Sequence, residues 1–309
     1  MKKQSALSWL VPLIAILAAI TASIGLFSMN GDGPFQFTTL HNETVEIYGR
    51  GLYRYDTPLI AVGYRVSDAF TLIVGIPLLL ISFWMVRRGS IRGKILLTGT
   101  LLFFLYNFGS LAIGAAYNNL LLIYIILTMA TFLTATSLLI SFDMQTFPTL
   151  FSDRVPRREI SIFFLLSGIA LFCIWLFLNI VPALLARGVP AELASYTTVI
   201  TFVVDMGIIA PVLVVTGILF RRREPLGYVL SSVLLIFIDA LGTSLLTMGI
   251  AQQVAGLMNI GQFIGFVVSF AILTLFSLGF TIILFRNITD TSSIQTGNSR
   301  FPKLHRKEV

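Results

Sequence analysis

The chain is poor in charged residues. Charged residues make up 11% of its 309 residues, compared with about 25% in an ordinary soluble domain, whereas hydrophobic residues make up 56%. So few charges cannot cover a surface that faces water, and the composition therefore indicates a membrane protein. A formal net charge of +7 is explained below by membrane topology, so we expect no nucleic-acid partner.

Cysteine and histidine, the residues that form disulfides and bind soft metals, are nearly absent. A single cysteine, Cys173, excludes a disulfide or a dithiol relay within one chain. His41 and His305 lie outside the apolar segments, so zinc or haem held within the membrane is not expected. The sequence also lacks a GxxxxGK[ST] phosphate loop and a GxSxG nucleophile motif. We therefore expect no metal and no cofactor.

Long apolar runs are what the sequence has instead. A helix needs about 20 mostly apolar residues to cross a bilayer, and continuous runs of this length favour helices over barrel strands. The sequence thus predicts an all-α polytopic bundle with eight transmembrane helices. They are expected at Trp9–Phe27, Ser67–Val86, Ile95–Tyr117, Leu120–Ser141, Ile160–Leu184, Thr197–Phe220, Leu226–Met248 and Met258–Phe285.

Lysine and arginine residues predict the orientation of these helices. Basic residues concentrate in cytoplasmic loops, and an arrangement with both termini inside puts 17 of the 21 there. The four on the outside are Arg50, Arg54, Arg65 and Arg187. The first segment, which follows Lys2 and Lys3, also resembles a signal peptide, but its apolar run is long for one and favours an uncleaved anchor.

The predicted helices divide the chain into two halves. Residues 1–141 form a first four-helix half with an extracytoplasmic loop at 28–66, and residues 160–285 form a second. Residues 142–159 link the halves, and 286–309 are expected to be a disordered basic tail. In the outer loop we expect a hairpin of Thr44–Tyr48 with Leu52–Tyr55 and a helix start at Asp56-Thr57-Pro58. Four tyrosines are expected mainly at the level of the lipid headgroups: Tyr48, Tyr53, Tyr55 and Tyr64.

The two halves share a weak pattern. A shift of 134 residues places Thr71–Leu97 on Asp205–Ser231, so that each copy has a proline, a basic turn and a glycine in the same order. Both copies run from outside to inside, which predicts a parallel repeat of four helices plus four. The alternative is chance, because apolar segments align easily.

Polar residues within apolar segments are the candidates for a site, because an ionisable group in a membrane is costly. Asp205 and Asp239 are expected at about 12 and 14 Å below the outer surface, on consecutive antiparallel helices. The remaining polar candidates are Asp68, Asn107, Asn179 and Gln262, and the candidate helix breaks are Pro77 and Pro211.

Two interpretations of these residues remain open. In one, they line a cavity open to the outside, where Asp205 or Asp239 carries a proton or holds a cation, and the prolines expose backbone carbonyls. In the other, the acids are structural and bond across helices, which is ordinary in membrane bundles. The pattern slightly favours the structural interpretation.

Several short sequence segments resemble those of a group of prokaryotic multi-pass membrane proteins with no assigned activity. They are Gly51–Asp56, Asp205–Pro211, Arg221–Arg223 and Pro225–Tyr228. The resemblance implies a prokaryotic plasma membrane and a helical bundle but no mechanism. We favour a transporter-like or small-ligand-binding protein over a sensor, assembly or scaffold protein, and both over an intramembrane acid–base enzyme. The expected partners are the lipid bilayer, including anionic lipids at the cytoplasmic face, and a protein partner or a second copy of the chain.

Overall fold

The computed structural model describes residues 2–289, apart from the side chains of residues 2–6 and 191. The part of the predicted tail from residue 290 onwards lies outside these residues. Within them, eight helical spans are long and apolar enough to cross a membrane, and the predicted all-α bundle is confirmed. The spans are Leu7–Phe27, Pro58–Arg87, Ile91–Gly114, Leu121–Ile140, Arg157–Leu185, Phe202–Arg221, Pro225–Val254 and Ile260–Arg286.

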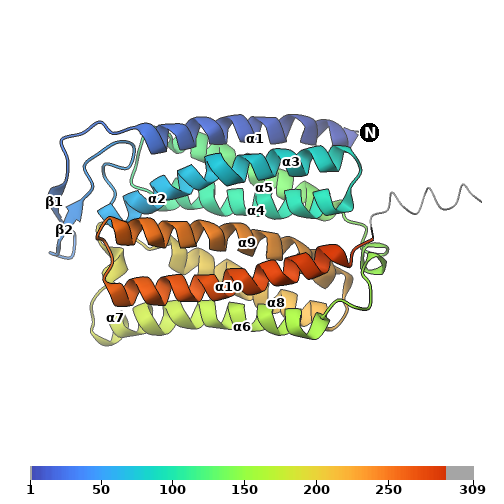
Figure 1. Cartoon of the computed structure of the whole chain (residues 1–309). Helices are drawn as coiled ribbons and strands as arrows, with labels where there is room; N and C mark the ends of the chain where they lie inside the picture. Colours follow the sequence, from blue (N-terminus) through green and yellow to red (C-terminus); the bar gives the residue numbers. More distant parts are fainter. Residues whose placement is uncertain (1, 290–309) are drawn as a thin grey trace, which may run out of the picture.

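The eight spans lie side by side along one axis (Figure 1). Five of them are single helices, whereas the second, fifth and sixth contain a short π-helical segment. The single helices are α1 (Lys2–Phe27), α4 (Ile91–Gly114), α5 (Leu121–Ile140), α9 (Pro225–Val254) and α10 (Ile260–Arg286). The compound spans are α2 (Pro58–Phe70) with η1 (Thr71–Gly75) and α3 (Ile76–Arg87), α6 (Arg157–Trp175) with η3 (Leu176–Ile180) and α7 (Val181–Leu185), and η5 (Phe202–Ile209) with α8 (Ala210–Arg221).

Proline explains the three π-helical segments. Proline lacks a backbone N–H, and its ring clashes with the carbonyl four residues earlier, so the turn before it widens. Pro77, Pro182 and Pro211 each lie two residues after such a segment. Pro77 and Pro211 were predicted to break their helices; the structure instead shows continuous spans that widen locally and then resume.

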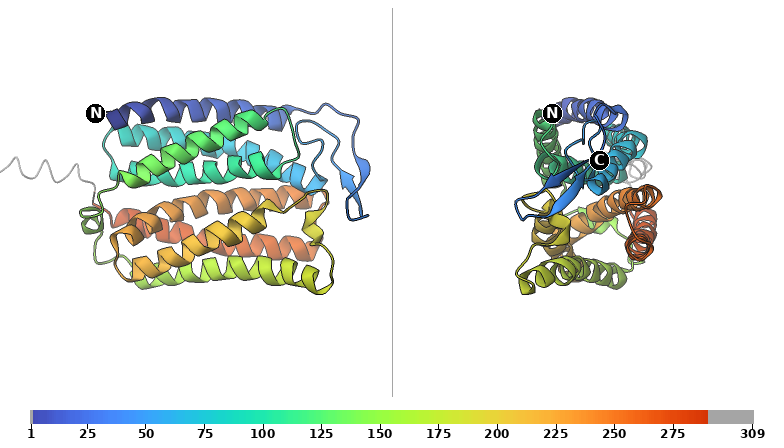
Figure 2. Two further views of the ribbon diagram at one scale, coloured as in Figure 1. Left: turned by 180° about the vertical axis from the view of Figure 1, so that it is seen from behind. Right: turned by 90° about the vertical axis from the view of Figure 1, so that its left-hand side faces the viewer.

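The spans form two groups, α1–α5 and α6–α10, which lie one beside the other (Figure 2). In the first group the spans contact one another in a ring, since α1 touches both α2–α3 and α5, and α4 touches both α3 and α5. The second group repeats this order, since α6 touches α8 and α10, and α9 touches the same two. The same neighbours in both groups are what the predicted parallel repeat requires.

Helix α9 joins the two halves by packing on α4 and α2. Gly99 of α4 permits close approach, because a Cβ atom there would lie 2.5 Å from Cβ of Ile236 in α9. On α2, Gly63 lies against Met248, and the side-chain amide of Gln252 donates a hydrogen bond of 2.9 Å to the Leu59 carbonyl. The junction is thus held by glycine contacts along its length and a hydrogen bond near one end.

The two ends of the bundle differ. One end, which we call the hairpin end, carries strands β1 (Phe35–Thr38) and β2 (Thr44–Ile47). The other, which we call the arginine end, carries the short turns after α3 and α8 and the connection from α5 to α6 with the 3-10 turn η2 (Phe147–Leu150). Large apolar side chains such as Leu122, Leu166 and Leu275 are exposed along the helices and form the surface for lipid.

The outer loop differs from its prediction. β2 pairs with β1, in register Phe35 with Ile47, and residues 52–55 form a turn instead of a strand. Gly49 and Gly51 have positive φ, and a side chain at either position would strike the backbone of Gly33 or Ser28. The glycines therefore fold the loop back on itself and do not form the turn of the predicted hairpin.

Other predictions for this loop had mixed outcomes. The helix start is confirmed, because Thr57 is the N-cap of α2 and proline occupies its first turn. The headgroup position is wrong for Tyr53, which is 1% exposed and donates a hydrogen bond to an acid inside the bundle. Tyr48 also forms a hydrogen bond within the protein, since its hydroxyl accepts one of 2.7 Å from Arg65.

Candidate functional site

Asp205 lies at the junction of the two halves. It is in η5, is 8% exposed, and both its carboxylate oxygens are hydrogen-bonded. The hydroxyl of Tyr106, from α4 of the first half, donates to Oδ1 at 3.0 Å. The indole Nε1 of Trp175, from α6 of the second half, donates to Oδ2 at 3.0 Å. One carboxylate therefore links helices from both halves.

Aromatic rings hold the two donors in place. The Trp175 ring packs on Phe202 of η5 with a centroid distance of 5.1 Å. The Tyr106 ring meets Phe237 of α9 edge-on at 6.0 Å. No pattern in the sequence predicts that Tyr106 and Trp175 meet Asp205, because they lie 99 and 30 residues from it along the chain.

The backbone beside Asp205 is π-helical, so its carbonyl accepts from the N–H of Ala210, five residues on. The equivalent bond in η1 joins the carbonyl of Thr71 to the N–H of Ile76. Both segments precede the prolines that the 134-residue shift aligns. Because π-helical turns occur frequently at functional sites, their position next to buried acids is a relevant feature of both halves.

Asp239 belongs to a different network. It lies in α9, and its Oδ2 accepts a hydrogen bond of 2.6 Å from the hydroxyl of Thr281 in α10. Its Oδ1 is buried without a hydrogen-bond partner. The sequence suggested that Asp205 and Asp239 are close enough to couple, but the structure turns them toward different neighbours.

Asp68 is the buried acid of the first half. It is 1% exposed in α2, and its Oδ2 accepts a hydrogen bond of 2.7 Å from the Tyr53 hydroxyl. Gly25 of α1 packs directly against this carboxylate, with no room for a side chain. Asp68 thus faces the first span of its own half, as Asp205 faces Trp175 of the fifth span.

Asn107 joins the same region of the first half. Its amide oxygen accepts a hydrogen bond of 2.7 Å from Ser67, and its nitrogen donates to the hydroxyl of Thr71 at 3.4 Å. These two partners lie on either side of Asp68 along the chain. Asn107 therefore connects α4 to α2 and η1.

Asn179 and Gln262 lie apart from these networks, at the hairpin end. The side-chain amide of Asn179 faces the carboxylate of Glu192, to which its nitrogen can donate. Gln262 forms a capping box with Asn259 at the start of α10, with hydrogen bonds of 3.0 and 2.9 Å. The structure thus gives Gln262 a helix-capping role and places it at an exposed position.

Asp56 is a buried acid that sequence reasoning treated only as part of a helix start. It is fully buried, and its Oδ1 accepts hydrogen bonds of 2.8 Å from both the Ala116 N–H and the Tyr196 hydroxyl, whereas its Oδ2 is buried without a partner. Burial raises the pKa of this carboxyl from 3.8 to about 6, although the two hydrogen bonds oppose the rise. Asp56 joins the outer loop of the first half to that of the second.

A hollow of about 350 Å³ opens beside Tyr196 at the hairpin end. Its walls are mainly apolar and come from the hairpin, the end of α4 and the segment before η5. The lining residues are Phe35, Phe37, Ile47, Tyr55, Ile113, Gly114, Ala115, Ala116, Ser195, Tyr196, Thr197 and Thr198.

In comparisons with known proteins, no family model, curated protein or solved structure matches the chain. Among the described residues, no group of three or more metal-binding side chains lies together. The eight apolar spans and the composition establish a multi-pass integral membrane protein that contacts the lipid bilayer.

Proposed function

We propose that the protein is transporter-like and binds a proton, a cation or a small ligand at Asp205, between two repeated four-helix halves. The observation that carries this proposal is the pair of hydrogen bonds to Asp205, one from Tyr106 and one from Trp175. A group that changes the charge of this carboxylate alters a bond across the junction, which is the link that alternating access needs.

The chemistry of the donors determines which oxygen takes the proton. The indole of Trp175 can only donate, so Oδ2 must remain an acceptor to keep that bond. A tyrosine hydroxyl both donates and accepts, so Tyr106 can rotate its hydrogen away and accept from a protonated Oδ1. Protonation of Asp205 therefore reverses the hydrogen bond to the first half and leaves the bond within the second half unchanged.

Access to Asp205 is proposed from the hairpin end. The hollow there is lined by Gly114 at the end of α4 and by Thr198 just before η5. Ile200 packs tightly on Gly114, and it lies between Thr198 and Asp205 along the chain. We propose the contact of Ile200 with Gly114 as the gate between this hollow and the carboxylate.

A distance measurement tests the alternation without knowledge of the substrate. In a Cys173→Ala background, spin labels are placed at Tyr117 and Ile260, at the hairpin end, and in a second protein at Ile140 and Arg222, at the arginine end. Each pair joins the two halves. We expect acidification from pH 8 to pH 5 in liposomes to change the two distances in opposite directions.

Asp205→Asn should remove this response, because its side chain no longer titrates, whereas Asp239→Asn should retain it. The same variants are then compared in proteoliposomes loaded with a pH-sensitive dye while candidate small solutes are added outside. Distances that respond to pH equally in the wild type and in Asp205→Asn would refute a coupling role for Asp205.

The distribution of basic residues supports a further part of the proposal: the arginine end faces the cytoplasm of a prokaryotic cell and the hairpin end faces outside. A cysteine at Asp32, in the Cys173→Ala background, should react with a membrane-impermeant maleimide on intact cells. A cysteine at Arg222 should react only after the cells are permeabilised. The opposite pattern would overturn the orientation.

A sensor or scaffold function is the second candidate, and exposed apolar side chains on the hairpin favour it. Phe35 and Phe37 are 44% and 46% exposed, and Leu40 is 94% exposed. Such a cluster outside the membrane suits a protein partner. A photo-crosslinker at Phe37 that captures one stoichiometric partner, and loses it when Leu40 is replaced by serine, would favour this function over transport.

A further inference from the structure

The arginine end contains a second hollow, of about 460 Å³, between the start of α6 and the end of α8. Four arginines line it against one acid: Arg157, Arg158, Arg221, Arg223 and Glu159. Arg158, Arg221 and Arg223 are exposed on the surface, and the side chain of Arg157 is largely buried. The proposed transport site does not use any of these residues.

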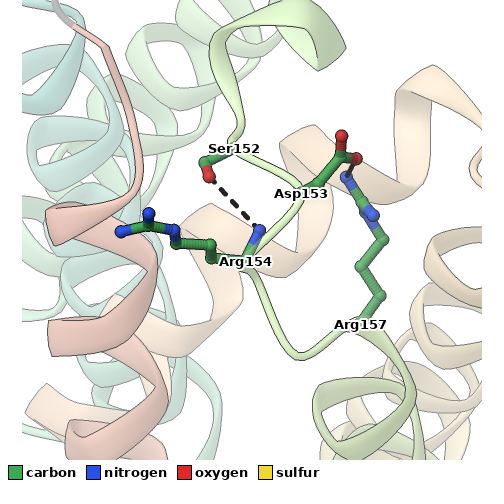
Figure 3. Close-up of polar contacts among 4 residues, drawn as sticks. All are labelled: Ser152, Asp153, Arg154 and Arg157. Atoms are coloured by element: carbon green, nitrogen blue, oxygen red, sulfur yellow. Dashed lines mark hydrogen bonds and ion pairs between the residues drawn. The ribbon is translucent and has the colours of Figure 1, made fainter.

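Arg157 has hydrogen-bonding capacity that the protein leaves unused. Figure 3 shows its guanidinium turned toward Asp153, whereas the side chain of Arg154 points away to the other side of the loop. The ion pair with Asp153 is 3.4 Å long, and the carboxylate is fully exposed, so the pair is weak. The Nε of Arg157 is buried without a hydrogen-bond partner, and the guanidinium carbon lies 5.8 Å from the centre of the Tyr228 ring.

Arg223 occupies a backbone position that normally favours glycine. Its φ is +62°, in the left-handed region, at the end of α8. The turn is closed by hydrogen bonds from the Arg223 N–H to Phe220 and from the Glu224 N–H to Leu219, a Schellman motif. An arginine here keeps an unfavourable conformation and brings its side chain to the hollow.

The first half has the same turn with glycine in that position. Gly89 has a φ of +80°, and the N–H groups of Gly89 and Ser90 bond to Val86 and Met85 in the same pattern. Gly89 corresponds to Arg223 under the 134-residue shift. The turn itself therefore does not need arginine, and the strain at Arg223 is unexplained by folding.

The basic residues of the first-half turn are used differently. The Arg88 guanidinium stacks over the Trp84 ring at 3.8 Å, and that of Arg87 lies 5.9 Å from the centre of the Phe83 ring. The corresponding residues of the second half include Arg221, which lines the hollow. A basic turn at the end of a span thus does not by itself produce an arginine-lined hollow.

The hollow also includes the start of α6. The N-cap of this helix is Pro156, which has no side chain to accept from the first-turn N–H groups. Backbone donors at a helix start favour anions, and arginine donors match phosphate oxygens in geometry. The arginines are the main donors at the hollow, and the helix start adds backbone donors to them.

We propose that this hollow binds a phosphate group, carried either by an anionic lipid headgroup or by a soluble phosphate compound. Its position at the ends of the spans is the level at which lipid phosphates lie. Clustered arginines beside a span are the ordinary means of holding such headgroups. Four arginines against one acid fit a phosphate better than they fit a neutral ligand.

The test uses the full-length protein in detergent micelles, titrated with phosphatidylglycerol or phosphatidylcholine and followed by native mass spectrometry. We expect phosphatidylglycerol to bind more tightly. Arg223→Gly should weaken that binding about fivefold, the contribution of one basic residue near an anionic lipid. The same variant should keep or raise the melting temperature, because glycine removes the strain at this position.

Arg222→Gln is the matched control. It removes the same charge from the same turn, but Arg222 does not line the hollow. Its binding should match the wild type. Equal losses in Arg222→Gln and Arg223→Gly, or no loss in Arg223→Gly, would overturn the proposal.

Competition distinguishes the two sources of phosphate. Inorganic phosphate that displaces phosphatidylglycerol from the wild type, but not from Arg223→Gly, would assign the hollow to soluble phosphate compounds. Phosphatidylglycerol binding that resists inorganic phosphate would assign it to a lipid headgroup. Equal affinity for phosphatidylglycerol and phosphatidylcholine, with no binding of inorganic phosphate, would exclude both.

Discussion

At the hairpin end, local opening should become easier as the pH rises, and replacing Asp56 by asparagine should remove this pH dependence. Asp56 is fully buried, and burial raises its pKa from 3.8 to about 6. The folded protein therefore binds the proton more tightly than the unfolded chain does. The stabilisation that comes from protonated Asp56 is fully present below about pH 4 and is lost as the pH rises through about 6.

The size of this effect follows from the difference between the two pKa values. About two units correspond to about 3 kcal/mol, which is an upper value because local opening exposes Asp56 only in part. Asparagine at position 56 keeps an acceptor for Ala116 and Tyr196 and carries no charge. The Asp56→Asn variant should therefore open less readily than the wild type at pH 7.5, and the difference should disappear near pH 4.

Hydrogen exchange measures this local opening, in peptides that cover residues 53–57, 114–117 and 192–198, with rates corrected for intrinsic exchange at each pH. Asp32→Asn is the control, because Asp32 is exposed in the same loop and its replacement removes the same charge. It should keep the pH dependence of the wild type. An Asp56→Asn variant with that same pH dependence would refute the assignment of the effect to Asp56.

Two further predictions concern the buried acids of each half. Gly25→Ala should destabilise the protein by about 1–3 kcal/mol, because the new methyl group strikes the Asp68 carboxylate. Gly279→Ala is the control: its methyl group meets open space, so the variant should be neutral or slightly stabilising. Unfolding in mixed micelles measures both free-energy changes. Trp175→Phe should cost about 1–3 kcal/mol, because it leaves one oxygen of Asp205 buried without its donor. In a double-mutant cycle with Asp205→Asn the two losses should not add, and strict additivity would show that the indole acts only by packing.

The sequence predicted the spans well and their ends less well. Apolar length is a direct requirement of the bilayer, so all eight spans were found. Their ends were misplaced where a helix continues beyond the predicted apolar run. The second span was predicted to begin at Ser67, but it includes the helix start predicted at Asp56-Thr57-Pro58 and begins at Pro58, and α9 continues past Met248 to Val254.

In the candidate site, too, the sequence predicted single unusual residues but not the residues that they contact. Asp205, Asp68 and Pro211 stand out in a sequence because an acid or a proline within an apolar run is unusual. Their partners do not stand out, because Tyr106, Trp175 and similar aromatic residues are ordinary in membrane helices. Asp56 was not predicted as a buried acid for another reason: it lies in a polar loop, where acidic residues are common.

The sequence by itself determined the number of spans, the unequal distribution of basic residues between the two ends, and the presence of acids at depth, because each follows from the cost of placing polar groups in lipid. Only the tertiary structure decided that Asp205 is bonded from both halves and that Asp239 turns toward α10 instead. It also decided that four arginines surround one hollow. These features depend on which helix faces each neighbour, and that choice is made by packing between residues far apart in the chain.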